Sequence, residues 1–427
     1  MDTNAPKTPA TLPLAAWPAL TPAGAAREVH ARVAALPAPL RAAALAWLRP
    51  EMELAAQFAL VRAQSGPLRG VPYMLKDLFD LAGVPTRAGS TFLEKIRSTP
   101  TADSRIVTRL GELGATCAGK THLVEFASGL TGENPHYGDC PHPLFPDRLT
   151  GGSSSGSAAL VAAGVVPLAI GTDTGGSVRV PAAWCGLFGF RLTPGGEFIR
   201  DAFPLAPTMD TAGWFTAKAA QMLAVWSNLV GQPTGRAPGR GCYLPMSALL
   251  PNADGETARA CDEAAGRICP QADETVQAAL LENWRDAVDA YVTIGMSEAH
   301  AVHRDWLAPF HEYYDPVIWQ RFTDAGQWPA ERIARARATL TSIRSGWERY
   351  FAAHDFLVLP AVPGPAPRKA DCTPELRHNI LTLTAPASLG GLPVLSLPVA
   401  LSGGLTAGLQ VILPAADSPV VPWLLSR

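Results

Sequence analysis

The chain has 427 residues, of which 48% are hydrophobic and 17% charged, and its formal net charge is −2. A chain of this length and apolar content can bury a large core, as soluble globular enzymes do. The near-neutral charge gives no electrostatic footprint for nucleic acid or an anionic membrane. No apolar run reaches the roughly 18 residues that a membrane-spanning helix needs.

The seven cysteines are scattered and never spaced as CxxC, which argues against a disulfide framework and against a structural zinc site. The first 25 residues are rich in Pro, Ala and Thr, without a basic segment followed by an apolar one. We therefore expect a frayed N-terminus rather than a signal peptide, and a cytoplasmic enzyme.

The first third of the chain predicts helices followed by a buried strand. Residues 24–65 carry Ala, Leu and Val at helical spacing, interrupted near Pro37 and Pro50, and predict two or three helices. The apolar run 70–77 predicts a buried strand that delivers Lys76 at its carboxyl end. The pattern then favours a helix over 102–113, a short strand over 115–118 and the start of a helix over 121–129.

Two loops rich in Gly and Ser follow, GGSSSGS at 151–157 and GTDTGGS at 171–177. Between them, small residues over 158–166 predict a helix and residues 166–170 predict a strand. This alternation indicates an α/β core with a mixed or parallel sheet.

The composition changes over 231–350, where charged and aromatic residues are more frequent and the spacing is helical. We expect a single domain over 1–427, with a core over 24–230 and 351–427 and a helical cap over 231–350. Strands are predicted again at 356–360 and 394–398.

The two glycine-serine loops suit acyl transfer chemistry. Glycines allow tight turns that expose consecutive N–H groups, and such groups can stabilise the oxyanion of an acyl intermediate. Ser177 ends one loop, where its hydroxyl can meet a carbonyl carbon. A hydroxyl needs a base to become a nucleophile, and a buried lysine with a lowered pKa, here Lys76, suits that role.

Together, these loops and the lysine motif resemble the amidase signature family. The resemblance is carried by GVPYMLKD at 70–77, GGSSSGS at 151–157 and GTDTGGSVRVPA at 171–182, and it covers 66–230 and 354–413. It implies an α/β fold with a mixed central β-sheet flanked by helices and with a helical cap. It also implies hydrolysis of an acyl amide through an acyl-enzyme, with neither a metal nor a cofactor.

Matched residue by residue, the resemblance makes Ser177 the nucleophile, Ser153 the relay serine held by a cis peptide, and Lys76 the base. Asp173 and Arg179 are implied to support the nucleophile loop. The implied oxyanion hole is formed by the N–H groups of Thr174, Gly175, Gly176 and Ser177.

The resemblance also places a substrate pocket at Ala127, Ser128 and Gly129, where Ala127 leaves room for the acyl group. It predicts a small-molecule amide as the partner and a monomer or homodimer, and it leaves the identity of the amide open. Six aromatic residues of the cap either line the pocket mouth or pack in the core, and their helical spacing favours the core: Trp306, Phe310, Tyr313, Tyr314, Trp319 and Phe322.

Two other functions remain open. In one, the chain is an A-type subunit of a multi-protein amidotransferase and is inactive alone. In the other, it is an esterase with a Ser-His-Asp triad on Ser154, an interpretation that rests on GxSxG at 152–156. That motif needs a preceding strand, whereas 140–150 is rich in proline and predicts irregular structure.

Two further motifs have simpler explanations. Residues 114–121 fit the phosphate-loop pattern GxxxxGK[ST], but the predicted strand lies inside the motif, so we expect Lys120 to be structural. His300 and His303 lie one helical turn apart and suit a metal, but no acidic third ligand accompanies them. We expect their helix face to line the pocket.

Overall fold

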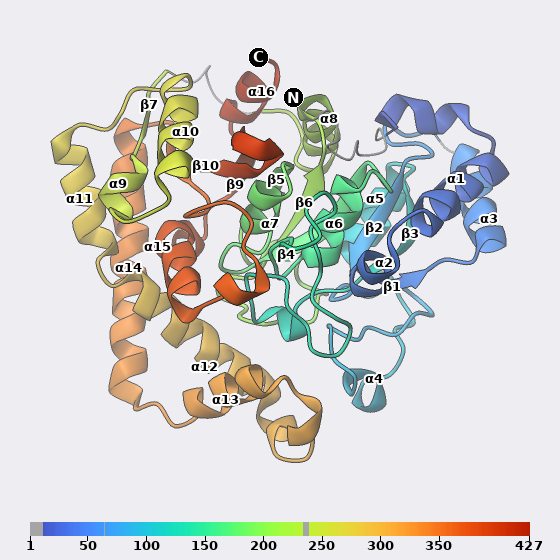
Figure 1. Ribbon diagram of the computed structural model, residues 1–427, viewed down its shortest axis with the longest axis horizontal. Coiled ribbons are helices and arrows are strands. Elements are labelled where there is room, and N and C mark those ends of the chain that lie inside the picture. The colour runs from blue at the N-terminus through green and yellow to red at the C-terminus, as the bar shows by residue number, and fades with distance from the viewer. Residues whose placement is uncertain (1–11, 64, 234–238) are drawn as a thin grey trace.

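The centre of the fold is a mixed β-sheet (Figure 1). The computed structural model describes residues 12–63, 65–233 and 239–427. Within these residues the sheet has ten strands in the order β1-β3-β2-β4-β6-β5-β9-β10-β8-β7. The strands are β1 (Leu45–Leu48), β2 (Pro72–Lys76), β3 (Thr116–Thr121), β4 (Leu168–Asp173), β5 (Phe188–Arg191), β6 (Thr211–Thr216), β7 (Gly241–Tyr243), β8 (Phe356–Pro360), β9 (Val394–Ala400) and β10 (Thr406–Ile412).

Three neighbouring strands near one end of the sheet are parallel. β2 pairs in parallel with β3 on one side and with β4 on the other, and all three strands are buried along their whole length. Burial on both faces explains why their sequences read as apolar or small-residue runs without alternation. Because they are parallel, their carboxyl ends meet at one edge, which places Lys76 beside the loop after β4.

Helices cover both faces of the sheet, and each face has its own hydrophobic core. Met74, Ala169 and Phe215 point to one core, together with residues of helices α1 to α3 and α6. Leu75 and Ile170, their neighbours in sequence, point to the other core, as the two-residue period of a strand requires. The first core is covered by α1 (Pro22–Ala34), α2 (Ala38–Ala44), α3 (Glu51–Arg62) and α6 (Ser155–Ala162).

The remaining helices of the core lie between strands or after them. They are α4 (Leu93–Ile96), α5 (Arg105–Glu112), α7 (Arg179–Trp184), α8 (Ala219–Leu229), α15 (Pro374–Gly390) and α16 (Val420–Leu425). Short 3-10 helices lie at Leu14–Ala19, Glu125–Ala127, His311–Tyr313, Lys369–Asp371 and Ser402–Gly404.

Six helices lie within the range of the predicted cap. They are α9 (Met246–Leu249), α10 (Gly255–Gly266), α11 (Glu274–Trp284), α12 (Ala287–Leu307), α13 (Pro316–Ala325) and α14 (Ala330–Ala353). Helix α12 packs against α13, α14 and α15 (Figure 1). The same range holds β7, which pairs with β8, so the central sheet continues into it. The division into core and cap stays a prediction.

Most predicted elements are present, including strands β2, β4, β8 and β9 and helices α1 to α3, α5 and α6. Residues 45–48 lie in the range predicted to be helical, but they form strand β1 directly after α2. The helix predicted over 121–129 is wrong, because β3 continues to Thr121 and only a short 3-10 turn follows. Phe126 and Ala127 in that turn have φ values of 47° and 61°, which lie outside the right-handed helical region, so an α-helix cannot continue through them.

The expected frayed N-terminus is also wrong for part of its range. Residues 14–19 form a 3-10 helix whose Trp17 is 1% exposed, and α1 begins at Pro22. Burial of this indole fixes the segment against the core. Residues 1–11 lie outside the described part of the chain.

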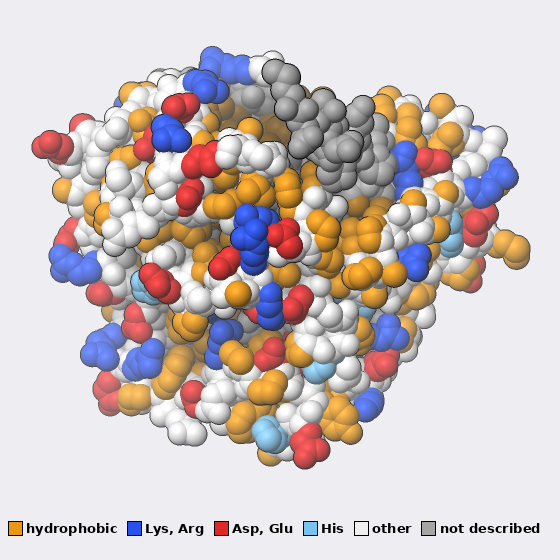
Figure 2. All heavy atoms as spheres, in the orientation of Figure 1, with side chains coloured by type: hydrophobic (Ala, Val, Ile, Leu, Met, Phe, Trp, Pro, Cys, Tyr) orange, Lys and Arg blue, Asp and Glu red, His pale blue; other side chains and the backbone are white. Residues whose placement is uncertain are grey.

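The surface carries charges of both signs, in keeping with the net charge of −2. On the face shown in Figure 2, basic and acidic side chains are interspersed among hydrophobic and neutral ones. None of the described helices is long and apolar enough to cross a membrane.

Candidate active site

The ammonium group of Lys76 lies at the centre of a cluster of hydroxyl groups. Lys76 ends β2 and is fully buried. Its Nζ donates to Ser153 Oγ at 2.8 Å, to Ser154 Oγ at 2.9 Å and to Thr172 Oγ1 at 2.7 Å. No carboxylate of the described residues forms a salt bridge with Lys76, so its charge is balanced only by neutral dipoles at hydrogen-bond distance.

This environment changes the proton affinity of Lys76. Burial lowers the pKa of Lys76 to about 7, although the more distant negative charges of Asp173 and Asp210 oppose the shift. Desolvation disfavours the charged form of an amine. A large fraction of Lys76 is therefore neutral near pH 7 and able to accept a proton.

Ser153 is held at the start of helix α6. The peptide bond between Gly152 and Ser153 is cis, and the N–H of Gly152 donates to Leu130 O at 2.8 Å. A side chain at Gly156 would overlap the carbonyl oxygen of Ala44, so only glycine lets α6 approach α2 so closely. The close approach of α6 and the hydrogen bond of Gly152 fix the glycine-serine loop beside Lys76.

The loop that carries Ser177 is organised around the buried carboxylate of Asp173. Asp173 accepts from the N–H groups of Gly176 and Val178, both at 2.9 Å, and forms salt bridges with Arg179 at 2.8 Å and Arg191 at 2.9 Å. Burial raises the pKa of Asp173, but the two guanidinium charges and the hydrogen bonds outweigh it and lower that pKa well below its usual value. Asp173 therefore stays ionised and holds the loop.

The predicted oxyanion donors differ in their surroundings. The N–H of Gly176 already donates to Asp173, so it is not free for an oxyanion. The N–H groups of Gly175 and Ser177 have no acceptor within the described residues. The side chain of Thr174 donates to Asp210 at 2.6 Å. The N–H of Thr174, like those of Gly175 and Ser177, has no acceptor among the described residues, so three of the four predicted N–H groups are free.

Ser177 opens into a small cavity that also holds the predicted pocket residues. Its side chain is 2% exposed, and Ala127, Ser128 and Gly129 line the same space. Leu205 and Met296 add apolar walls. No hydrogen bond joins Ser153 to Ser177 within the described chain, whereas Lys76 and Ser153 are in direct contact.

Four residues at this site were not expected from the sequence. Thr172 is a third hydroxyl partner of Lys76. Tyr291 of α12 and Arg377 of α15 line the cavity next to Ser177, and Thr384 of α15 lies 2.6 Å from the carbonyl oxygen of Gly175. Only Thr172 had a local signal, because it lies two residues after the predicted strand 166–170, in the glycine-rich loop that leads to Ser177.

The alternative motifs have structural roles. Lys120 lies within β3 and forms a buried salt bridge with Asp77 at 2.5 Å, as its structural assignment predicts. Ser154 is fully buried and donates to the carbonyl oxygen of Thr172 at 3.0 Å, so it is held within the cluster around Lys76.

The two histidines of α12 do not line the Ser177 cavity, contrary to expectation. His303 is fully buried, its Nδ1 lies 2.9 Å from Tyr314 Oη, and burial lowers its pKa to about 3. His300 Nδ1 contacts the carbonyl oxygen of Phe322 at 2.9 Å. Of the six cap aromatics, Tyr314 and Phe322 are buried, and Trp306, Phe310 and Trp319 are partly buried against the core, as the core interpretation predicts. Tyr313 is 44% exposed, so for this residue the core interpretation is wrong. The described residues contain no cluster of three or more metal ligands.

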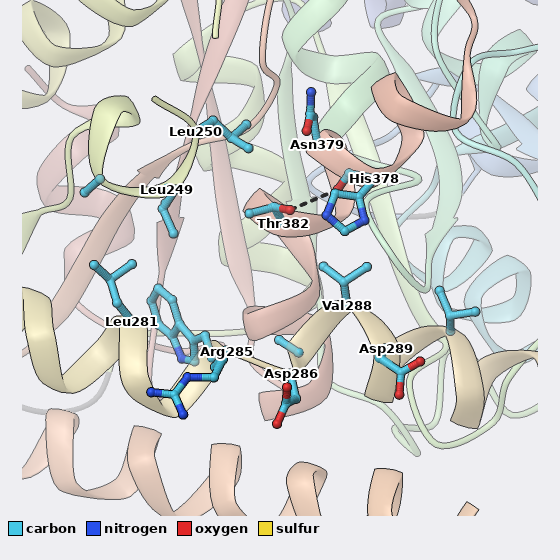
Figure 3. A pocket seen from close by; sticks show the side chains of 14 residues that line it. Leu249, Leu250, Leu281, Arg285, Asp286, Val288, Asp289, His378, Asn379 and Thr382 are labelled. Atoms are coloured by element: carbon cyan, nitrogen blue, oxygen red, sulfur yellow. Dashed lines mark hydrogen bonds between the residues drawn. The ribbon is translucent and has the colours of Figure 1, made fainter. Parts of the chain in front are cut away.

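A larger cavity of about 590 Å³ lies elsewhere, between α11, α12 and α15. Figure 3 shows Asp286, Asp289 and His378 at its rim and Leu249 and Leu281 on its walls. Neither Lys76 nor either predicted catalytic serine reaches it. The chemistry described above is therefore confined to the smaller cavity at Ser177.

Comparison with known proteins agrees with this geometry. A family model described as Amidase matches residues 25–242 and 244–419. The chain belongs to the amidase family. As a member of this family it is a hydrolase that acts on amide C–N bonds, and the resemblance read from its motifs is confirmed, as is the fold class.

Relatives of known name span most of the chain. Indoleacetamide hydrolase of Pseudomonas savastanoi is 32% identical over 368 residues, which cover 81% of this chain and 79% of the relative. An A-type subunit of glutamyl-tRNA(Gln) amidotransferase from Methanococcoides burtonii is 30% identical over 390 residues, covering 82% of each chain. A solved crystal structure of an amidase superposes with a TM-score of 0.81 at 30% identity and covers 96% of both chains.

Proposed function

We propose that this chain hydrolyses a carboxylic acid amide through an acyl-enzyme on Ser177, with Lys76 as base and Ser153 as proton relay. The observation that carries the proposal is the buried Nζ of Lys76, 2.8 Å from Ser153 Oγ, with a pKa near 7. A base is most effective when its pKa lies near the working pH.

In the first half-reaction, neutral Lys76 takes the proton of Ser153, and Ser153 takes the proton of Ser177. The freed oxygen of Ser177 attacks the amide carbonyl carbon. This step requires a hydrogen bond between the two serines that forms with the substrate in place, as catalytic contacts often tighten in the Michaelis complex. The N–H groups of Gly175 and Ser177 donate to the oxyanion.

Collapse of this intermediate breaks the C–N bond. The leaving nitrogen takes a proton that returns from Lys76 through Ser153, and ammonia or an amine departs. Water then attacks the ester on Ser177 by the same proton path, which releases the carboxylic acid and restores the enzyme. The acyl group would lie beside Ala127, Ser128 and Gly129, which share the cavity with Ser177.

A second function is supported by the relative from Methanococcoides burtonii, which is named as part of an amidotransferase. In that case the chain would carry the same serine and lysine chemistry but act only within a multi-protein assembly. Turnover by the purified chain alone separates the two functions.

The experiment is a product screen by mass spectrometry. Wild type, Ser177→Ala and the control Ser247→Ala, an exposed serine of α9, each receive primary amides, anilides, esters, carbamates and ureido acids. We expect the wild type and the control to release the acid, with activity at least about 10⁴-fold lower in Ser177→Ala. Equal turnover in Ser177→Ala would refute the mechanism, and no turnover by folded wild type would favour the role in an amidotransferase assembly.

A further inference from the structure

Two arginines line the route from the surface to Ser177. Arg377 of α15 lines both the small space beside Ser177 and an adjoining cavity of about 420 Å³. Arg321 of α13 lines the adjoining cavity, and its Nη1 donates to the carbonyl oxygen of Ser128 at 3.2 Å. Ser128, Gly129 and Leu130 line both spaces, so the two adjoin each other.

Neither arginine forms a salt bridge with a carboxylate of the described residues. The acidic groups of the same cavity have other partners. Glu133 and Asp139 both pair with Lys369, at 2.6 and 2.9 Å. Asp315 accepts from the N–H groups of Val317 and Ile318 and caps helix α13. Three basic and three acidic side chains line this cavity, and the two arginines are its basic groups without an ion pair among the described residues.

Both arginine side chains are half-buried, which partly shields their charges from water. Burial lowers the pKa of Arg377, and burial together with the like charge of Arg377 lowers the pKa of Arg321 to about 10. Both guanidinium groups remain protonated at neutral pH. A half-buried guanidinium without an ion pair is stabilised by a bound anion, and the ligand that fits it best is a planar anion that accepts two hydrogen bonds.

Resting on the proposed function, we propose that the substrate is an amide that also carries a carboxylate, which Arg377 and Arg321 bind. Arg377 is the nearer group, because it shares the space beside Ser177 with the reacting carbonyl. The amide end then lies at Ser177 and the acid end points toward the 420 Å³ cavity. Neutral amides of the same length lack this contact.

The test compares matched substrates. Monoamides of malonic, succinic, glutaric and adipic acid are each paired with the linear amide that has a methyl group in place of the carboxylate. We expect wild type to prefer the acids. In Arg377→Gln the ratio of kcat/KM for acid over neutral amide should fall about 10- to 100-fold, the range for a hydrogen bond to a charged group. Arg321→Gln should lower the same ratio by a smaller factor.

Two comparisons make the result specific. Arg335→Gln removes an exposed arginine of α14 and should leave the ratio unchanged. Arg377→Lys keeps the charge but not the planar pair of donors, so it should restore part of the ratio lost in Arg377→Gln. A ratio that is the same in wild type and Arg377→Gln would overturn the proposal, even if every protein hydrolyses amides.

Binding is measured separately on Ser177→Ala by isothermal titration with glutaric acid monoamide and pentanamide. We expect the acid to bind more tightly, and the difference to disappear when Arg377→Gln is added. This outcome without turnover by wild type would reject the proposed hydrolase while supporting the anion site. Equal affinity for both amides would reject the anion site whatever the activity.

Discussion

The hydroxyl oxygen of Thr384 lies 2.6 Å from the carbonyl oxygen of Gly175, a residue 209 positions earlier in the chain. The backbone carbonyl of Thr384 also accepts from Arg179 Nη1 at 2.8 Å. Helix α15 therefore contacts the loop on both sides of Ser177. The Gly175 carbonyl shares its peptide plane with the N–H of Gly176, which donates to Asp173, so this contact helps to hold the backbone from Gly175 to Ser177 in place. The positions of the free oxyanion donors therefore depend on a helix that is remote in sequence.

Thr384→Val should lower kcat by about 10- to 100-fold with little change in KM, because a misdirected oxyanion donor weakens binding of the transition state alone. Thr384→Ser keeps the hydroxyl and should retain most of the activity. Steady-state kinetics on both variants provide the comparison. Similar losses in the two would show that packing at position 384, not the contact with Gly175, sets the rate.

The pKa of Lys76 predicts the pH profile. The neutral amine is the active form, so kcat/KM should rise with pH and level off above a midpoint near 7, the pKa to which burial lowers this group. Rates measured from about pH 5 to 10 give the midpoint. In Lys76→Met the residual activity should be orders of magnitude lower and should not rise with pH around 7. An unchanged pH profile of kcat/KM in that variant would rule out Lys76 as the base.

The same shift predicts how stability depends on pH. The folded-state pKa of Lys76 is about 7 and its ordinary value is 10.5, so the unfolded chain binds this proton more tightly. Protonation of Lys76 therefore destabilises the folded protein by its full amount below pH 7, and this destabilisation decreases as the pH rises toward 10.5. The Tm of Lys76→Met should exceed that of wild type by more at about pH 6 than at about pH 9.

Lys218→Met, at an exposed lysine, is the control for this measurement. Its Tm difference from wild type should be nearly the same at both pH values. A Lys76→Met difference that is equally independent of pH would mean that Lys76 is not desolvated in the folded protein.

Asp173 should be important for stability as well as for the loop. Asp173→Asn leaves Arg179 and Arg191 buried without a counter-charge, which should lower the free energy of unfolding by about 3–5 kcal/mol. Urea unfolding followed by circular dichroism measures this difference. Asp305→Asn removes an exposed carboxylate, 81% accessible, and should change stability little; equal losses in the two variants would contradict the structural role of Asp173.

The sequence was sufficient to predict the parts of the site that depend on local motifs. The runs at 70–77 and 166–170 predict strands because they are short, apolar and bounded by glycine-rich turns. Once these strands are parallel neighbours, Lys76 and the loop of Ser177 must lie at the same edge of the sheet. The meeting of Lys76 with the loop of Ser177 therefore follows from the two strand patterns once their pairing is known, whereas the contact between Lys76 and Ser153 is set by the loop before α6.

The rest of the site depends on contacts between distant segments. Tyr291, Arg377 and Thr384 lie on helices whose sequences carry no motif, and only packing of α12 and α15 against the core brings them to Ser177. The hydrogen bond from the Gly176 N–H to Asp173 could not be predicted either, because it depends on the direction of the backbone within one turn. Strands β5, β6, β7 and β10 were not predicted, and each contains a glycine, which weakens a strand signal.

The position of Tyr291 affects how segments can be exchanged between members of this enzyme family. Its hydroxyl occupies the space that a side chain at Gly175 would need, so a helix from the middle region of the chain is fitted against the nucleophile loop. A chimera that exchanges residues 231–350 for the corresponding segment of another family member would leave a void or a clash at this point. The residue at position 175 and the residue facing it from α12 are therefore best transplanted as a pair, and the middle region is not an interchangeable module.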